Sequence, residues 1–136
     1  MGNRRKSREF AVQLIYMYLM NSENTEEANN NFWKEHDDVS LTRDFSDKLY
    51  QGVCAHKEEI ESWIKKLCIN WDLDRLVYMD RSILMLALYE MIFLEDIPYT
   101  VSINEALELA KKFSNVDSSK FINGVLDNAK KELEKC

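Results

Sequence analysis

Apolar residues recur at helical spacing along almost the whole of this 136-residue chain. The clearest stripe comprises Ile103, Ala106, Leu107, Ala110 and Phe113, whose spacings of about three and four residues place them on one helical face. Similar stripes predict helices over about 4–20, around 32–33, over 42–55, 60–68, 80–94, 102–113 and 118–133, with only a bend near residue 55 between the third and the fourth. We find no pattern typical of a strand, a repeat or a linker. The sequence therefore predicts an all-α fold, a compact bundle of about seven helices in one domain spanning residues 1–136.

The segment from about Asp80 to Leu94 differs from the others because it is apolar nearly all round. Such a segment is typical of a helix that is buried on several sides, so we expect it to be central. Glu90 lies inside this apolar run, where a carboxylate needs either a partner or a surface. An internal hydrogen bond and a protein-binding face both remain open. Pro98 ends the segment, because the residue before a proline is pushed out of the helical region.

Helix starts are indicated by polar residues ahead of the apolar stripes. Ser102 and Glu105 have the spacing of a capping box, Thr42 is a candidate N-cap of the third helix, and Asp117 or Ser118 is a candidate N-cap of the last one. Gly124 interrupts the last stripe at a cost of about 1 kcal/mol relative to alanine. We expect a close approach between two helices as the reason for this glycine.

Composition agrees with a helical protein. One proline and three glycines provide little material for the turns of an all-β fold. The longest apolar run, Ile83 to Leu94, is interrupted by Glu90 and is too short to span a bilayer, so no membrane association is expected. Three cysteines without CxxC spacing suggest reduced thiols and a cytoplasmic protein.

The charge is distributed unevenly. Arg4, Arg5, Lys6 and Arg8, together called the N-terminal basic cluster, contribute +4. Since the whole chain carries −6, residues 9–136 carry −10. A basic end on an acidic body predicts a local anion-binding patch, although a solvated and frayed N-terminus remains an equally good interpretation.

No motif in the sequence indicates enzymatic activity. The chain has no glycine-rich phosphate loop and no GxSxG motif. Cys54 and His56 are two residues apart, so on a helix they point to different faces and make a poor metal pair. We therefore expect no catalytic residue, no metal and no cofactor.

A nucleic-acid interface is the better-supported hypothesis. The N-terminal basic cluster begins the first helix, and Gln13 and Tyr16 follow along it. Phe113, Lys120 and Phe121 flank the start of the last helix, whose free amide groups favour an anion. Basic groups neutralise phosphates, while glutamine and aromatic side chains meet unstacked bases. Each phenylalanine taken alone also fits the core stripe.

Several segments, taken jointly in their order and spacing, resemble the NusB family of bacterial transcription antitermination factors. The matching segments are 5–13 with Tyr16; 80–84 with Ala87, Tyr89 and Glu90; 97–98 with Val101; 103–106 with 109–111; and Ser118 with 121–127. Two positions depart from the family pattern. Met85 stands where a basic residue is frequent, and Ser102 stands where alanine is common.

The resemblance implies an all-helical fold of two packed sub-bundles without catalysis. It implies binding to the boxA sequence of nascent, chiefly ribosomal, RNA as a single strand, together with the small-subunit ribosomal protein NusE. That complex would join NusA and NusG on RNA polymerase to suppress termination. Carried over by position, the RNA contacts would be Arg4, Arg5, Lys6, Arg8, Gln13, Phe113, Asp117, Ser118, Lys120 and Phe121. The contacts to NusE would be Tyr16, Asp80 and Glu90.

Two other interpretations remain. One is an RNA-targeting domain related to the NusB-like N-terminal part of ribosomal RNA cytosine methyltransferases. That enzyme needs a large appended catalytic domain, and this sequence of 136 residues contains none. The other is a helical scaffold that binds only protein and whose binding to NusE does not depend on RNA.

Overall fold

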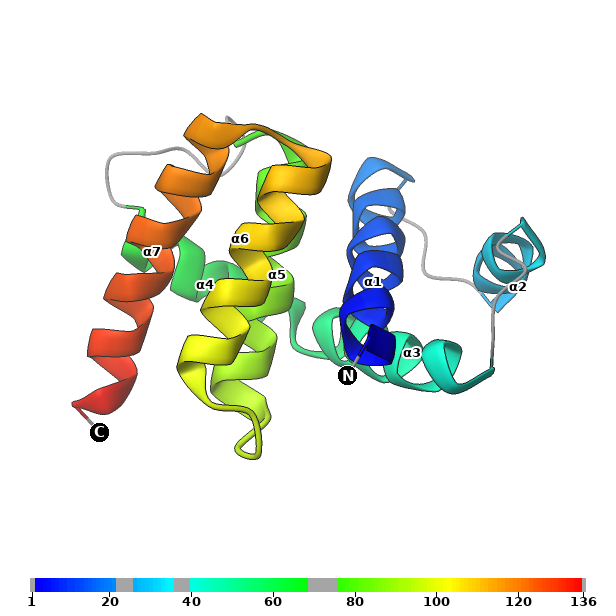
Figure 1. Ribbon diagram of the computed structural model, residues 1–136, viewed down its shortest axis with the longest axis horizontal. Helices are drawn as coiled ribbons and strands as arrows, with labels where there is room; N and C mark the ends of the chain where they lie inside the picture. The colour runs from blue at the N-terminus through cyan, green and yellow to red at the C-terminus, as the bar shows by residue number, and fades with distance from the viewer. Residues whose placement is uncertain (1, 22–25, 36–39, 69–75, 136) are drawn as a thin grey trace.

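The helical prediction is confirmed by the structure, a computed structural model that describes residues 2–21, 26–35, 40–68 and 76–135. Within these residues the chain forms seven helices and no strand (Figure 1). The helices are α1 (Gly2–Asn21), α2 (Glu26–Glu35), α3 (Ser40–Ala55), α4 (Lys57–Leu67), α5 (Tyr78–Phe93), α6 (Tyr99–Phe113) and α7 (Val116–Glu134).

Helix α5 is the central helix, as its apolar sequence predicts. It packs against α1, α3, α4, α6 and α7, and its residues from Ser82 to Met91 are all buried. No other helix in the described part of the chain is buried on so many sides. The helices surround α5 in two groups, with α1, α2 and α3 on one side and α4, α6 and α7 on the other (Figure 1).

Aromatic residues attach α2 to its group. The rings of Phe32 and Trp33 meet the ring of Phe10 on α1 edge-on, with centroids 6.0 and 5.3 Å apart. The indole nitrogen of Trp33 also donates to a carboxylate oxygen of Asp47 on α3 at 3.2 Å. The short second helix predicted around residues 32 and 33 is thus present, and these two side chains hold it against α1 and α3.

The predicted bend near residue 55 is also present, since α3 and α4 are separated only by His56. The imidazole of His56 stacks on the ring of Phe93 with centroids 3.9 Å apart. This contact holds the corner between α3 and α4 against the end of α5.

The predicted capping box at Ser102 and Glu105 is wrong. Helix α6 begins at Tyr99, and its N-cap residue Pro98 is extended, with φ −60° and ψ 144°, a conformation that suits the fixed φ of proline. Ser102 therefore lies one turn inside the helix, where it is buried and donates to Glu90. Glu105 points toward α1 and binds arginine side chains there.

Two further N-caps differ from the prediction. The side chain of Asn115 caps α7 by accepting from the Ser118 amide at 2.8 Å, so Asp117 and Ser118 belong to the first turn. Helix α3 begins at Ser40, two residues before Thr42. In both cases the helix begins earlier in the chain than the predicted N-cap residue.

The glycine that lies at a close helix contact is Gly52 rather than Gly124. A Cβ atom at Gly124 would meet nothing within 4 Å, and this residue is exposed, so the predicted close approach is wrong. A Cβ atom at Gly52 on α3 would lie 2.1 Å from Cζ of Tyr89 on α5. The tyrosine ring thus occupies the space that a side chain at position 52 would need.

Candidate nucleic-acid interface

The candidate interface is built along α1 and α6, which run in the same direction (Figure 1). Three ion pairs join them: Arg5 and Arg8 bind Glu105 at 2.8 and 3.5 Å, and Lys112 binds Glu9 at 2.7 Å. Between the helices lies a groove of about 220 Å³, here called the α1–α6 groove. Its lining residues are Arg5, Arg8, Glu9, Glu105, Glu108, Leu109 and Lys112.

Arg8 extends into the protein at the base of this groove and is only 4% exposed. Its guanidinium donates to both carboxylate oxygens of Glu90, at 2.8 and 2.9 Å, and the Ser102 hydroxyl donates to the same carboxylate at 2.9 Å. Glu90 is 1% exposed. Of the two interpretations of Glu90, the structure thus favours the internal one, and neither Arg8 nor Glu90 presents its charged group at the surface.

The other members of the N-terminal basic cluster are exposed. The guanidinium of Arg4 lies over the ring of Phe45, 4.4 Å from its centroid, and the ammonium of Lys6 lies 5.2 Å from the centroid of Phe10. Arg5 is paired with Glu105, yet its side chain is 58% exposed. Exposed ion pairs contribute only about 0–1 kcal/mol, so a phosphate group can compete for these cations.

The acidic side of the groove is not predicted by the sequence pattern. Glu9, Glu105 and Glu108 line it together with Lys112, and no motif marks any of them as a binding residue. The hydrogen bond from Arg5, together with the nearby positive charges of Arg5 and Arg8, holds the pKa of Glu105 below its ordinary value of 4.5. The carboxylate is therefore ionised at neutral pH and neutralises part of the basic cluster.

At the other end of the groove, Asp80 fixes the turn between α6 and α7. Its two carboxylate oxygens accept from the hydroxyls of Ser114 and Ser118, at 3.1 and 3.0 Å. Asp80 and Ser118 are both buried. The start of α5 thus sets the position of the α6–α7 turn through these hydroxyl groups.

The α6–α7 turn presents several of the predicted RNA contacts. Asp117 and Lys120 are exposed, and Phe113 and Phe121 are partly buried. The ammonium of Lys112 lies 5.7 Å from the centroid of Phe113. Since Lys112 also binds Glu9 on α1, it connects the turn to the groove.

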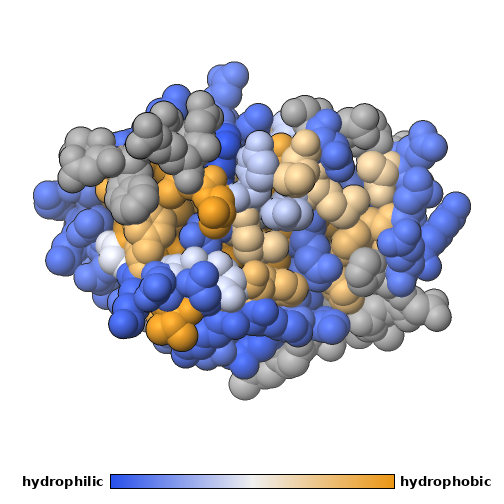
Figure 2. Space-filling model, turned by 90° about the horizontal axis from the view of Figure 1, so that it is seen from above, coloured by the Kyte–Doolittle hydropathy of each residue, from blue (hydrophilic) through white to orange (hydrophobic). Residues whose placement is uncertain are grey.

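Exposed apolar residues gather where α5 and α7 begin. Val77, Tyr78 and Val116 are all exposed, Val116 to 66%. Figure 2 views the molecule from this end and shows apolar residues interspersed with polar ones across the face. Helix α1 ends at the same end of the molecule (Figure 1), with Met20 exposed and Tyr16 partly buried. We call Val77, Tyr78 and Val116 the apolar end.

Neither Gln13 nor Met85 is fully exposed. Gln13 is partly buried, and its amide nitrogen donates to the Glu9 carbonyl at 3.1 Å. Met85 is completely buried in α5, so the position where the family often has a basic residue does not reach the surface in this protein.

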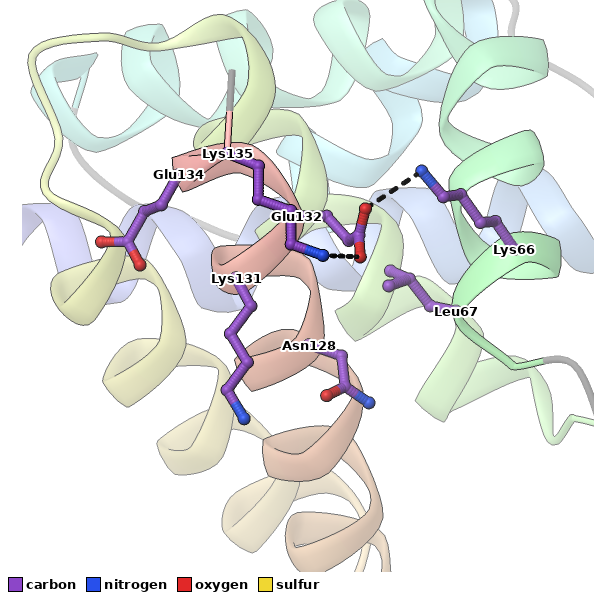
Figure 3. Close-up of a pocket in the computed structure, with 7 residues that line it drawn as sticks. All are labelled: Lys66, Leu67, Asn128, Lys131, Glu132, Glu134 and Lys135. Carbon is purple, nitrogen blue, oxygen red and sulfur yellow. Dashed lines mark hydrogen bonds and ion pairs between the residues drawn. The ribbon is translucent and has the colours of Figure 1, made fainter.

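A second hollow, of about 640 Å³, lies between the C-terminal parts of α4 and α7 (Figure 3). Lys66 on α4 and Lys135 on α7 both bind Glu132, at 3.4 and 3.3 Å. Lys131 binds Asp127 at 3.9 Å. These cations are paired with carboxylates and lie near helix C-termini, where positive charge is favourable, so the arrangement serves to join α4 and α7.

The cysteine and histidine residues form no reactive centre within the described ranges. Burial raises the pKa of the Cys54 thiol to about 11, so it is protonated at neutral pH. The described residues contain no grouping of three histidine, cysteine, aspartate or glutamate side chains that could hold a metal ion. Among the described helices, none combines the length and the apolar character that crossing a membrane requires.

Comparison with known proteins gives a consistent result over nearly the full length. The model of the NusB family matches residues 5–131. The transcription antitermination protein NusB of Bacillus licheniformis is 45% identical over 131 residues, covering 96% of this chain and 98% of that protein. The NusB protein of Bacillus subtilis is 42% identical over 132 residues, covering 96% and 97%.

Among solved structures, this chain is similar to one in a crystal structure of the antitermination factors NusB and NusE in complex with double-stranded RNA. The TM-score is 0.85, the identity is 29%, and the match covers 94% of this chain and 96% of that one. Fold, length and sequence thus agree with the resemblance found in the motifs. The chain belongs to the NusB family.

Proposed function

We propose that this protein is a transcription antitermination factor, a non-enzymatic adaptor that binds RNA together with NusE. One observation carries the proposal. The ion pairs of Arg5 with Glu105 and of Lys112 with Glu9 join α1 to α6 across the α1–α6 groove. Exposed basic residues of α1 lie near one of these pairs, and the aromatic residue Phe113 follows Lys112 of the other pair. Membership of the NusB family supports the same conclusion.

The RNA would follow this groove from the α6–α7 turn to the start of α1. Arg4, Arg5 and Lys6 would neutralise phosphates at one end, and Lys120 would do so at the other. Phe113 and Phe121 would offer ring faces to unstacked bases, as aromatic side chains do in proteins that bind single strands. Gln13 and Asp117 would also contact the strand, and the buried Ser118 would act by holding the turn through Asp80. Arg8 would hold the groove in shape through Glu90.

We propose single-stranded boxA RNA as the ligand. Exposed basic groups alone would suit any nucleic acid, because phosphate contacts carry no sequence information. Partly buried aromatic rings next to basic residues favour a strand with accessible bases. In the related solved complex the RNA is double-stranded, so a comparison of the two forms is part of the test below.

NusE would bind at the apolar end. Val77, Tyr78 and Val116 expose apolar surface there, and burying such surface drives protein association. Tyr16 on α1 would belong to this contact, because α1 ends at the same end of the molecule. Asp80 would act indirectly, by holding the turn that carries Val116.

An antitermination factor would act as part of a larger complex on RNA polymerase. We propose that the complex with RNA and NusE joins NusA and NusG on RNA polymerase, in the cytoplasm, where nascent transcripts are made. The protein would supply binding surfaces and no catalysis.

The test is a fluorescence anisotropy titration of labelled boxA RNA with and without NusE. We expect submicromolar binding when NusE is present and weaker binding by this protein alone. A scrambled RNA of the same length and a boxA duplex serve as controls. If NusE binds but the RNA does not, the protein is a scaffold for proteins only and the proposal is wrong.

A further inference from the structure

A hollow of about 600 Å³ lies where the start of α1 meets the connection between α5 and α6. Its walls include Arg4, Arg5, Asp96, Pro98, Val101 and Glu105. Arg5 and Glu105 also line the α1–α6 groove, so the hollow continues the groove beyond the ion pair that these two residues form. We call it the exit hollow.

One wall of the exit hollow suits a flat aromatic ligand. Pro98 is exposed and Val101 is 41% exposed, while Ile97 is buried beside them. Arg4 contributes a guanidinium plane that is already held against the ring of Phe45. Guanidinium planes stack on aromatic rings, and a nucleobase stacked in this way contributes substantially to binding.

The hollow carries carboxylate acceptors as well as the guanidinium donors of Arg4 and Arg5. A carboxylate repels phosphate groups and accepts hydrogen bonds from N–H groups. The Glu105 carboxylate is occupied by Arg5 and Arg8, so Asp96, which is exposed and lines the hollow, is the carboxylate that can accept from a ligand. Guanine presents two neighbouring N–H donors on its Watson–Crick edge, a geometry that matches one carboxylate.

We propose that the exit hollow binds one guanine base of the RNA, at the point where the strand leaves the α1–α6 groove. The base stacks between Arg4 and the surface of Pro98 and Val101, and its two N–H donors bind Asp96. The adjoining phosphate lies on Arg5. This proposal rests on the proposed RNA-binding function and adds a base-specific contact to it.

The test uses the full chain with NusE and labelled boxA RNA. Each guanine of the RNA is replaced in turn by inosine, which lacks the 2-amino group. With the wild-type protein we expect one of these replacements to weaken binding about tenfold. The same replacement should have no effect on the variant Asp96→Asn.

Two further variants test the apolar wall. Val101→Glu adds a negative charge inside the hollow and should weaken RNA binding about tenfold. Thr100→Glu adds the same charge one residue away, outside the lining of the hollow, and should change binding less than about twofold. Both positions lie in the first turn of α6, where acidic residues are favourable. Circular dichroism checks that both variants fold.

Three results overturn the proposal. The first is the absence of any inosine effect that depends on Asp96, and the second is an equal loss of RNA binding in Val101→Glu and Thr100→Glu. The third is a loss of NusE binding in Val101→Glu without RNA, which would assign the hollow to a protein partner. Failure of the wild-type protein to bind boxA RNA with NusE would instead overturn the proposed function, so the two failures are distinguishable.

Discussion

Arg8 and Glu90 lie 82 residues apart in the chain, yet their side chains form two hydrogen bonds of 2.8 and 2.9 Å inside the protein. The pair joins α1 to α5, and the hydroxyl of Ser102 adds α6. Arg8 therefore has a structural role, although it belongs to the N-terminal basic cluster. The neighbouring Arg4, Arg5 and Lys6 keep their charges at the surface.

Removing the negative charge of this pair should destabilise the protein strongly. Glu90→Gln removes the carboxylate that binds the buried guanidinium of Arg8 most closely and leaves only the longer contact of 3.5 Å to Glu105, which should cost about 3 kcal/mol. Urea unfolding followed by circular dichroism measures the change. Glu108→Gln is the control, because Glu108 is exposed and pairs only loosely with Lys111 at 3.8 Å; it should cost less than about 0.5 kcal/mol. Similar losses in both variants would contradict this account of the buried pair.

The ion pair between Arg5 and Glu105 should make stability depend on pH. The pKa of Glu105 is lower in the folded protein than its ordinary value of 4.5, so the unfolded chain binds more protons just below that value. The stabilisation is complete above about pH 4.5 and is lost as the pH falls through the folded pKa. Urea unfolding of wild type and Glu105→Gln between neutral pH and about pH 3 tests this. We expect a constant difference at higher pH that shrinks on acidification; a difference that grows would contradict it.

The two described helix-interior glycines should respond differently to alanine. Gly124→Ala adds a methyl group in open space and should raise the free energy of unfolding by about 0.5–1 kcal/mol. Gly52→Ala must displace the ring of Tyr89, which is stacked on Phe93 with centroids 5.5 Å apart. Its overpacking cost of about 1–3 kcal/mol should cancel or exceed the gain in helix propensity. Thermal unfolding of both variants gives the comparison, and equal gains would refute the close contact at Gly52.

Phosphate binding by the exposed basic residues should appear in the salt dependence. For Arg4→Gln/Lys6→Gln we expect the slope of log K against log salt to fall in magnitude by about 1.4, which is about 0.7 for each phosphate that is no longer neutralised. Lys131→Gln/Lys135→Gln removes the same charge at the hollow between α4 and α7 and should leave the slope unchanged. Anisotropy titrations at several salt concentrations measure both. A matching drop in the control pair would mean that only the net charge matters.

A negative charge at the apolar end should weaken the contact with NusE. Val116→Glu places a carboxylate in the first turn of α7, where it suits the helix dipole, so the fold should be retained. Desolvating this charge in an apolar contact should weaken NusE binding at least about tenfold. Thr100→Glu, at the opposite end of α6 (Figure 1), is the control. Calorimetric titration with NusE distinguishes the two, and unchanged affinity in Val116→Glu would place NusE elsewhere.

The helices are predictable because the pattern of apolar residues that indicates each helix lies within that helix. The stripe from Ile103 to Phe113 needs only the period of one helix, and the apolar segment of α5 shows its central place directly. The N-cap residue of a helix is harder to predict, because several neighbouring polar residues are suitable for that position. Asn115 occupies it where the residue pattern predicts Asp117 or Ser118, and Pro98 occupies it where the pattern predicts Ser102.

The site is predictable only in part, because its geometry depends on partners distant in the chain. Nothing near Glu105 in the sequence indicates that it binds Arg5, 100 residues away. The same holds for Gly52. A glycine is needed there because the ring of Tyr89, on another helix, occupies the space of a side chain. Charge counting identifies the basic cluster but not the carboxylates that oppose it, and so cannot separate Arg8 from its exposed neighbours.

The buried pair of Arg8 and Glu90 also orders the assembly of the protein. Helix α1 is synthesised first, yet its buried cation has no counter-charge until α5 and α6 have been made. Helices α4 to α7 are neighbours in the chain, as are α1 to α3, and contacts between such neighbours form fastest. We therefore expect each group to form its own contacts first and α1 to close on α5 and α6 when the two groups meet. Because that closure also creates the α1–α6 groove, the groove forms only after α6 has been synthesised.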